Sequence, residues 1–230
     1  MDKESEEITL LDKFFAHYER NPFLRALVKL CPYGSAVESA VLAFYQIWSR
    51  KMDVFAEELI TLDIHPAEER IQKREFLDSF AVTARRVQEA TSDEKIKRFA
   101  VLFASYYEGN SGFASIDEYE EYLGIVSELS EREFWILLVL NKFESQTLLC
   151  GRNPLQRAMQ FWDEFAGAVE KQAGIPGNEL TATLTRIQRT GLYEHFIGGY
   201  GDYAGGMGNL TPRFTKLINA LKAAGSRKGS

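Results

Sequence analysis

Hydrophobic residues recur at every third or fourth position along most of the chain, which is the periodicity of an amphipathic α-helix. Three stripes place four or five apolar side chains on one helix face. They are Phe76, Phe80, Ala84 and Val87; Ile96, Phe99, Phe103 and Tyr106; and Leu155, Met159, Trp162, Ala166 and Val169. The run 134–140 is apolar on every side, which predicts a helix buried at the centre of the molecule.

Helix-start signals accompany these stripes. Four Ser/Thr-x-x-Glu capping boxes begin at Ser35, Thr91, Ser115 and Ser130, and Asn153-Pro154 and Thr211-Pro212 place a cap residue before a proline. In a capping box the hydroxyl and the glutamate satisfy backbone N–H groups that the first helical turn leaves unpaired. The predicted helices are 8–20, 22–30, 35–63, 66–90, 92–108, 116–128, 131–147, 154–173, 178–191 and 212–223.

The last third of the chain follows a different order of elements. The helix ending near Gly191 precedes a short segment rich in β-forming residues, 192–197, and then a glycine-rich stretch, 198–208. The phrase Leu210-Thr211-Pro212 opens the last helix. This order predicts one β-hairpin between two helices.

The phrases Ile187-Gln188-Arg189-Thr190-Gly191-Leu192 and Leu210-Thr211-Pro212 resemble the end of a winged-helix domain. The whole chain also resembles bacterial helical proteins of uncharacterised function that have a winged-helix-like end. The resemblance implies a mainly α fold: an acidic helical bundle, 1–128, followed by a winged-helix-like domain with one small β-hairpin, 131–223. Residues 224–230 are expected to form a flexible tail.

Composition places the chain among ordinary globular proteins. It has 230 residues, of which 45% are hydrophobic and 26% charged, with a formal net charge of −6. Residues 1–147 carry 17 lysines and arginines against 27 aspartates and glutamates, whereas residues 148–230 carry ten against six. A signal peptide and a spanning helix of about 18 apolar residues are not recognisable, and the two cysteines fit a reducing compartment. These features predict a cytoplasmic protein that does not enter membranes.

Two interpretations of function follow, and the sequence leaves both open. The first is a non-enzymatic regulatory or adaptor protein whose winged-helix-like end binds nucleic acid. Arginine and threonine on an outward helix can contact phosphates and base edges. The predicted nucleic-acid-binding residues are Thr185, Arg186, Arg189, Arg213 and Lys216.

The second interpretation is a protein–protein interaction module that binds through the hairpin or through the acidic bundle, without nucleic acid. The glycine-rich hairpin lacks lysine and arginine, and glycine-spaced tyrosines suit protein recognition. The predicted protein-binding residues are Tyr193, Tyr200 and Tyr203.

Enzymatic chemistry has little support in the sequence. The three histidines have no histidine or cysteine partner at metal-binding spacing, and neither a phosphate-binding loop nor a nucleophile elbow is present. The acidic pairs lie at helix starts and on polar faces, where carboxylates are ordinarily solvated. No catalytic residue, metal or cofactor is therefore predicted.

Overall fold

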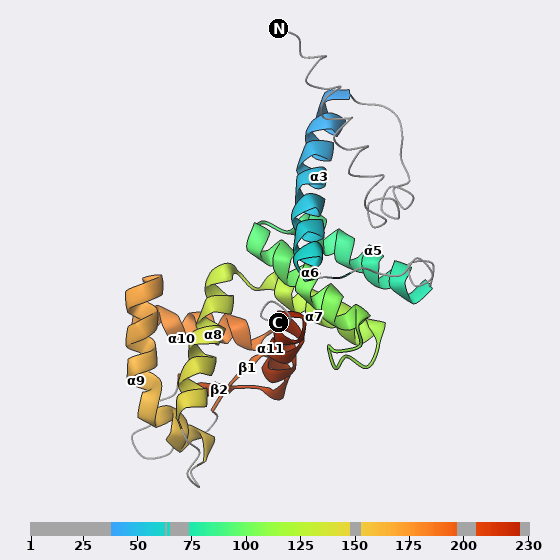
Figure 1. Ribbon diagram of the computed structural model, residues 1–230. Helices are drawn as coiled ribbons and strands as arrows, with labels where there is room; N and C mark the ends of the chain where they lie inside the picture. Colours follow the sequence, from blue (N-terminus) through green and yellow to red (C-terminus); the bar gives the residue numbers. More distant parts are fainter. Residues whose placement is uncertain (1–37, 63, 65–73, 148–152, 197–205, 226–230) are drawn as a thin grey trace.

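The computed structural model describes residues 38–62, 64, 74–147, 153–196 and 206–225 (Figure 1). This part of the protein is mainly α-helical with one small antiparallel hairpin, which confirms the predicted fold class. The predicted helices 8–20 and 22–30 lie outside the described residues, as do Tyr200 and Tyr203.

Four helices form the first half of the described fold: α3 (Glu38–Thr61), α5 (Arg74–Glu89), α6 (Asp93–Tyr107) and α7 (Ile116–Glu128). Helix α6 lies at their centre and contacts α3, α5, α7 and the last helix of the chain (Figure 1). A helix with neighbours on several sides must bury more than one of its faces. Its side chains at Ile96, Phe99, Leu102 and Phe103 are all buried.

Phe103 is the centre of an aromatic cluster that joins three helices. The centroid of its ring lies 6.0 Å from that of Phe55 on α3, and 5.6 Å and 5.9 Å from those of Phe76 and Phe80 on α5. Edge-to-face pairs of this kind contribute about 0.5–1.5 kcal/mol each beyond the burial of their area. The predicted stripe that contains Phe76 and Phe80 therefore packs against the predicted stripe that contains Phe103.

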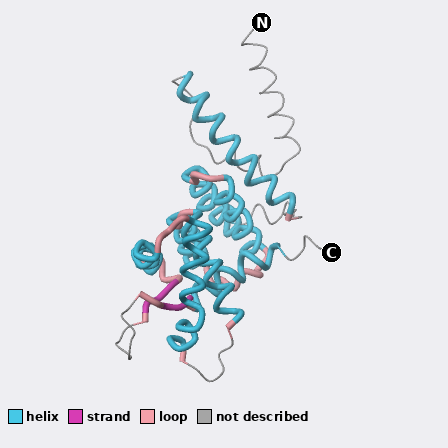
Figure 2. Tube along the Cα trace, turned by 90° about the vertical axis from the view of Figure 1, so that its left-hand side faces the viewer, coloured by secondary structure: helices cyan, strands magenta, loops and turns pink. Residues whose placement is uncertain are grey.

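The second half comprises α8 (Glu131–Gln146), α9 (Pro154–Ala173), α10 (Gly177–Gln188), β1 (Tyr193–His195), β2 (Gly208–Leu210) and α11 (Pro212–Gly225). Helices α8 and α9 pack side by side, and the hairpin lies at the edge of the helical body (Figure 2). In the hairpin Tyr193 pairs with Leu210, and His195 with Gly208. Helix α11 then returns to pack against α6.

The turns around the hairpin follow the sequence signals. Gly191 has a φ of +73°, the left-handed conformation expected after a helix end, although α10 itself ends three residues earlier at Gln188. Thr211 caps α11 by accepting a hydrogen bond from the Phe214 N–H, and its hydroxyl donates to the Gly191 carbonyl at 2.6 Å. The cap of α11 therefore also connects the start of this helix to the turn that follows α10.

The capping predictions are confirmed at Ser130 and corrected at Thr91. Ser130 and Glu133 form a reciprocal capping box at the start of α8. At α6 the cap is Ser92, whose hydroxyl accepts a hydrogen bond from the Lys95 N–H. The Thr91 prediction is wrong because the helix begins one residue later, at Asp93.

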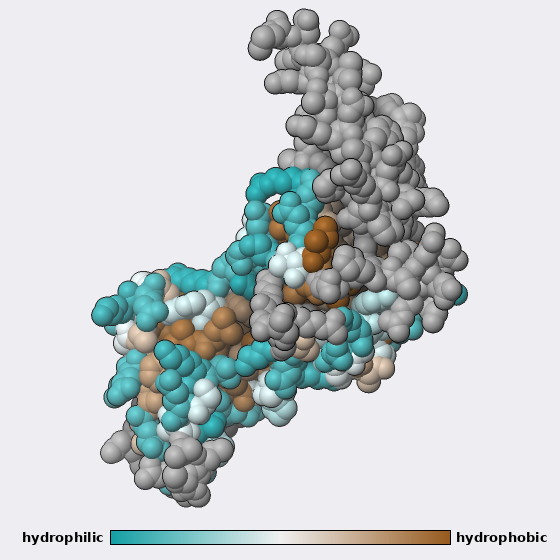
Figure 3. Space-filling model, viewed as in Figure 1, coloured by the Kyte–Doolittle hydropathy of each residue, from teal (hydrophilic) through white to brown (hydrophobic). Residues whose placement is uncertain are grey.

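Two burial predictions are also wrong. Helix α8 has a solvent side, where Leu138 is 41% exposed, and on α9 Met159 is 53% exposed. The buried residues of α9 are Ala158, Phe161, Trp162, Phe165 and Val169. Trp162 and Val169 of the predicted stripe are therefore buried, and the stripe is wrong at Met159. Hydrophobic surface is accordingly visible over α8 and α9, framed by hydrophilic residues (Figure 3).

The predicted division into domains falls on Leu129 and Ser130, the two residues between α7 and α8. Helix α11 belongs to the second predicted unit and packs against α6 of the first, so tertiary contacts connect the two predicted units. The separate identity of the two units stays a prediction.

Candidate functional site

The predicted nucleic-acid-binding residues of α10 lie on its exposed face, but one of them is engaged within the chain. Thr185, Arg186 and Arg189 are all exposed. Arg186 donates to both carboxylate oxygens of Glu133, through Nε at 2.6 Å and Nη2 at 2.8 Å. The Glu133 side chain is 5% exposed, so Arg186 neutralises a buried negative charge.

The two predicted cations of α11 are half-buried and pair with acids of α7. The Arg213 guanidinium forms an ion pair with Glu121, and Lys216 Nζ lies 2.5 Å from Glu118 Oε1. The Lys216 ion pair lowers the pKa of the Glu118 carboxyl, aided by a hydrogen bond from the Ala114 N–H. Three of the four predicted cations are thus paired with acids of the same chain.

Aromatic rings complete this contact between α11 and α7. Arg213 lies over the ring of Tyr122 at 5.5 Å, and Lys216 lies 5.7 Å from the ring of Phe113. A cation held between a carboxylate and a ring face has little freedom to turn toward a phosphate. Arg213 and Lys216 therefore belong to the packing of α11.

Of the predicted protein-binding tyrosines, Tyr193 is among the described residues, and Tyr200 and Tyr203 lie outside them. The Tyr193 side chain is 1% exposed, so its ring belongs to the core beneath the hairpin. The neighbouring His195 packs edge-on against it, with ring centroids 5.0 Å apart. Burial lowers the pKa of His195, whose Nδ1 lies 2.6 Å from Gln188 Oε1.

Glu144 anchors the hairpin to the helical body. Its Oε1 accepts a hydrogen bond from the Leu210 N–H of β2 at 2.9 Å, and its Oε2 pairs with Arg157 of α9 at 3.1 Å. Burial raises the pKa of this carboxyl. Helices α8 and α9 and strand β2 therefore meet at one half-buried ion pair.

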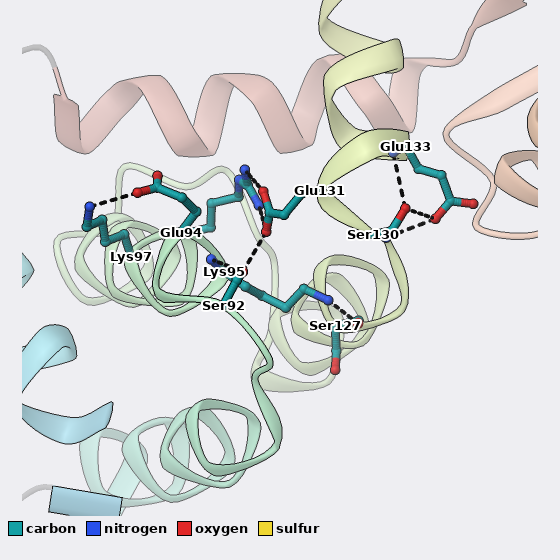
Figure 4. A network of polar contacts seen from close by, with 9 residues as sticks. Ser92, Glu94, Lys95, Lys97, Ser127, Ser130, Glu131 and Glu133 are labelled. Carbon is teal, nitrogen blue, oxygen red and sulfur yellow. Dashed lines mark hydrogen bonds and ion pairs between the residues drawn. The ribbon is translucent and has the colours of Figure 1, made fainter. Parts of the chain in front are cut away.

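A second polar network joins α6 to the start of α8 (Figure 4). Glu131 receives two hydrogen bonds from Arg98, at 2.9 Å and 2.5 Å, and one from the Ser92 hydroxyl at 2.8 Å. Lys95 is 8% exposed and donates to the Ser127 carbonyl at 2.8 Å. The Arg98 hydrogen bond lowers the pKa of Glu131, and burial lowers that of Lys95. This network therefore links α6 both to the end of α7 and to the start of α8.

Helix α7 has the most one-sided charge of the described helices. It contains five acidic residues and no basic one. We use the name acidic stripe for Asp117, Glu120, Glu121 and Glu128, which recur at helical spacing on the side opposite the buried Tyr119 and Leu123. Asp117, Glu120 and Glu128 are exposed and form no ion pair within the part of the chain that the structure describes.

A shallow pocket of about 350 Å³ lies between α7, α8 and α10. Two arginines, Arg186 and Arg189, line it together with Glu128 and Glu133. Its positive and negative side chains balance, so it has no net attraction for an anion.

Neither a metal centre nor a membrane span is found among the described residues. These residues contain no group of three or more histidine, cysteine, aspartate and glutamate side chains that could hold a metal ion. Within the same ranges, no helix has the length and apolar character needed to cross a membrane.

The pairing of α11 with α7 was not visible from the sequence. Glu118 and Lys216 lie 98 positions apart, and only the return of α11 to the first half brings them together. One signal was available: a helix with five acids and no base is a natural neighbour for cations elsewhere in the chain.

The chain matches none of the protein-family models, curated proteins or solved structures with which it was compared. The winged-helix resemblance therefore stays a prediction based on the two phrases around the hairpin.

Proposed function

We propose that this chain is a non-enzymatic regulatory or adaptor protein that binds a basic segment of a protein partner through the acidic side of its helical bundle. The observation that carries this proposal is the pairing of cations within the chain. Arg186, Arg213 and Lys216 neutralise Glu133, Glu121 and Glu118. The other three members of the acidic stripe, Asp117, Glu120 and Glu128, are exposed and form no ion pair among the described residues.

The charge balance supports a basic partner over a polyanion. Binding to nucleic acid gains affinity with each phosphate that a lysine or arginine neutralises. Of the four predicted cations, Arg189 alone forms no ion pair with another described residue, and one such contact gives little affinity. The chain has a net charge of −6, and its excess of acidic residues lies in the first half. This negative charge would attract a basic segment of a partner.

Two labelled probes test this proposal in parallel: a random DNA duplex and a peptide of alternating arginine and glycine. We expect the peptide to bind at low ionic strength and to weaken as salt is added, because screening shortens the range of charge attraction to about 8 Å at physiological salt. The DNA should not bind. Fluorescence anisotropy measures both.

Variants identify the surface. Glu120→Gln/Glu128→Gln should weaken peptide binding by about three- to tenfold, in line with the loss of two charges near a basic ligand. Glu179→Gln on α10 also removes one exposed acid, outside the acidic stripe, and should change binding less than twofold. If the wild type binds the DNA duplex and Arg189→Ala does not, the proposal is overturned in favour of the nucleic-acid interpretation.

A further inference from the structure

The shallow pocket between α7, α8 and α10 contains two opposite charges that do not pair with each other. Arg189 at the C-terminal end of α10 and Glu128, the last residue of α7, both line it. Both residues are exposed, and neither forms an ion pair with another described residue. The pocket therefore offers a ligand one positive and one negative group, which come from different helices.

The other two charges of the pocket neutralise each other. The buried carboxylate of Glu133 accepts hydrogen bonds from Nε and Nη2 of Arg186. The Ser130 hydroxyl also donates to this carboxylate, at 2.8 Å (Figure 4). Because each member of this ion pair has its partner, the pair favours neither an anion nor a cation. The selectivity of the pocket therefore depends on Arg189 and Glu128.

A ligand with both signs of charge suits this pocket better than a simple ion of either sign. An anion that approaches Arg189 is repelled by Glu128, and a cation that approaches Glu128 is repelled by Arg189. A ligand that carries a cation and a carboxylate side by side gains from both residues. The volume of about 350 Å³ is near the lower end of the range for ligand pockets, which fits side chains rather than a large molecule.

Glu128 also belongs to the acidic stripe, so the pocket continues the proposed binding surface. Along α7, Asp117 and Glu128 are separated by about 16 Å, from the rise of 1.5 Å per residue of an α-helix. An extended segment covers this length with about five residues. A basic segment that follows the stripe and pairs a cation with Glu128 therefore has its neighbouring residue at the pocket, beside Arg189.

We infer that this pocket binds a carboxylate of the partner's basic segment, next to the cation that pairs with Glu128. Arg189 donates hydrogen bonds to that carboxylate. The carboxylate belongs to an aspartate or glutamate side chain or to the C-terminus of the segment, which share this chemistry. This inference rests on the proposed function, because it specifies one end of the segment that the acidic stripe attracts.

The test uses the full-length protein and labelled peptides of alternating arginine and glycine with both termini blocked. One peptide carries aspartate at each end. Its control carries asparagine there, which has nearly the same shape and no charge. A third is the asparagine peptide with a free C-terminal carboxyl group. Arg189→Gln removes the positive charge of the pocket, and Lys171→Gln, which changes an exposed cation of α9 outside the pocket lining, is the matched control.

We expect the wild type to bind the aspartate peptide about three- to tenfold more tightly than the asparagine peptide, because a charge-assisted contact is gained. Attraction to the acidic stripe alone predicts the opposite order, since the aspartates lower the positive charge of the peptide. Arg189→Gln should bind the aspartate peptide no more tightly than the asparagine peptide. Lys171→Gln should keep the preference of the wild type. Fluorescence anisotropy measures each affinity.

The outcomes separate this inference from the proposed function. If the peptides bind but the preference for a carboxylate persists in Arg189→Gln, or is also lost in Lys171→Gln, the inference is overturned and the proposed function stands. A gain with the aspartate peptide or with the free C-terminus supports the inference and identifies the source of the carboxylate, whereas a gain with neither overturns it. If the wild type binds none of the peptides, the proposed function fails and the inference with it.

Discussion

At Gly208 a single residue decides whether the hairpin can close. A Cβ atom at this position would overlap the backbone oxygen of Glu194 and the hydroxyl of Tyr193 on the opposite strand. Tyr193 is among the largest fully buried side chains, so neither neighbour can move aside without disturbing the core. The sequence indicated a glycine-rich turn region, but it did not distinguish this glycine from those around it.

Gly208→Ala should therefore lower the free energy of unfolding by about 2 kcal/mol or more, as overpacking of a fixed site does. Gly167→Ala is the matched control, because Gly167 lies in the exposed middle of α9 with no atom within 4 Å of the added methyl group. That variant should gain about 0.5–1 kcal/mol from helix propensity. Urea denaturation measures both changes, and equal effects would contradict this account of the hairpin.

At the scale of elements, ion pairs between helices determine which charges remain available. Arg186 connects α10 to the capping box of α8, and Lys216 connects α11 to α7. A helix face assigned from periodicity alone contains Arg186 and Arg189 side by side, and it gives no indication that only one of them is engaged. Partners across a helix packing contact depend on the topology, which the local pattern does not specify.

Arg186→Ala should lower the free energy of unfolding by about 1.5–3 kcal/mol, because it leaves the buried carboxylate of Glu133 without its charged donor. Arg189→Ala, three residues further along the same exposed face, should change it by no more than about 0.5 kcal/mol. Chemical denaturation at pH 7 gives both values. A similar loss in the two variants would show that Arg186 is not a structural residue.

At the scale of the whole molecule, carboxylates with lowered pKa values connect the two halves of the fold. Glu131 joins α8 to α6 through Arg98, and Glu118 joins α7 to α11 through Lys216. A lowered pKa means that the unfolded chain takes up a proton at a higher pH than the folded chain does. The stabilisation is therefore complete above the ordinary pKa of glutamate, about 4.3, and is lost as the pH falls through the folded-state value.

We expect the urea midpoint of the wild type to fall as the pH drops below about 4.3, the ordinary pKa of glutamate. The midpoint of Arg98→Met should be lower at neutral pH and should fall less, because the Arg98 hydrogen bond is what lowers the pKa of Glu131. The methionine keeps an apolar stem against Phe134, over which the Arg98 guanidinium lies at 4.1 Å. Lys97→Met is the control, because Lys97 pairs with Glu94 on the exposed surface of the same helix. Parallel pH profiles for the wild type and Arg98→Met would refute a role for this pair in acid stability.

The sequence by itself determined the helical class, the hairpin and most element boundaries, because these depend on local signals: apolar periodicity, cap residues such as Ser130, and the left-handed Gly191. The tertiary structure decided what the charged and aromatic residues do. It buried Tyr193, exposed Met159 and paired Lys216 with an acid 98 positions away. Burial and ion pairing are properties of neighbours in space, and the return of α11 to α6 sets those neighbours.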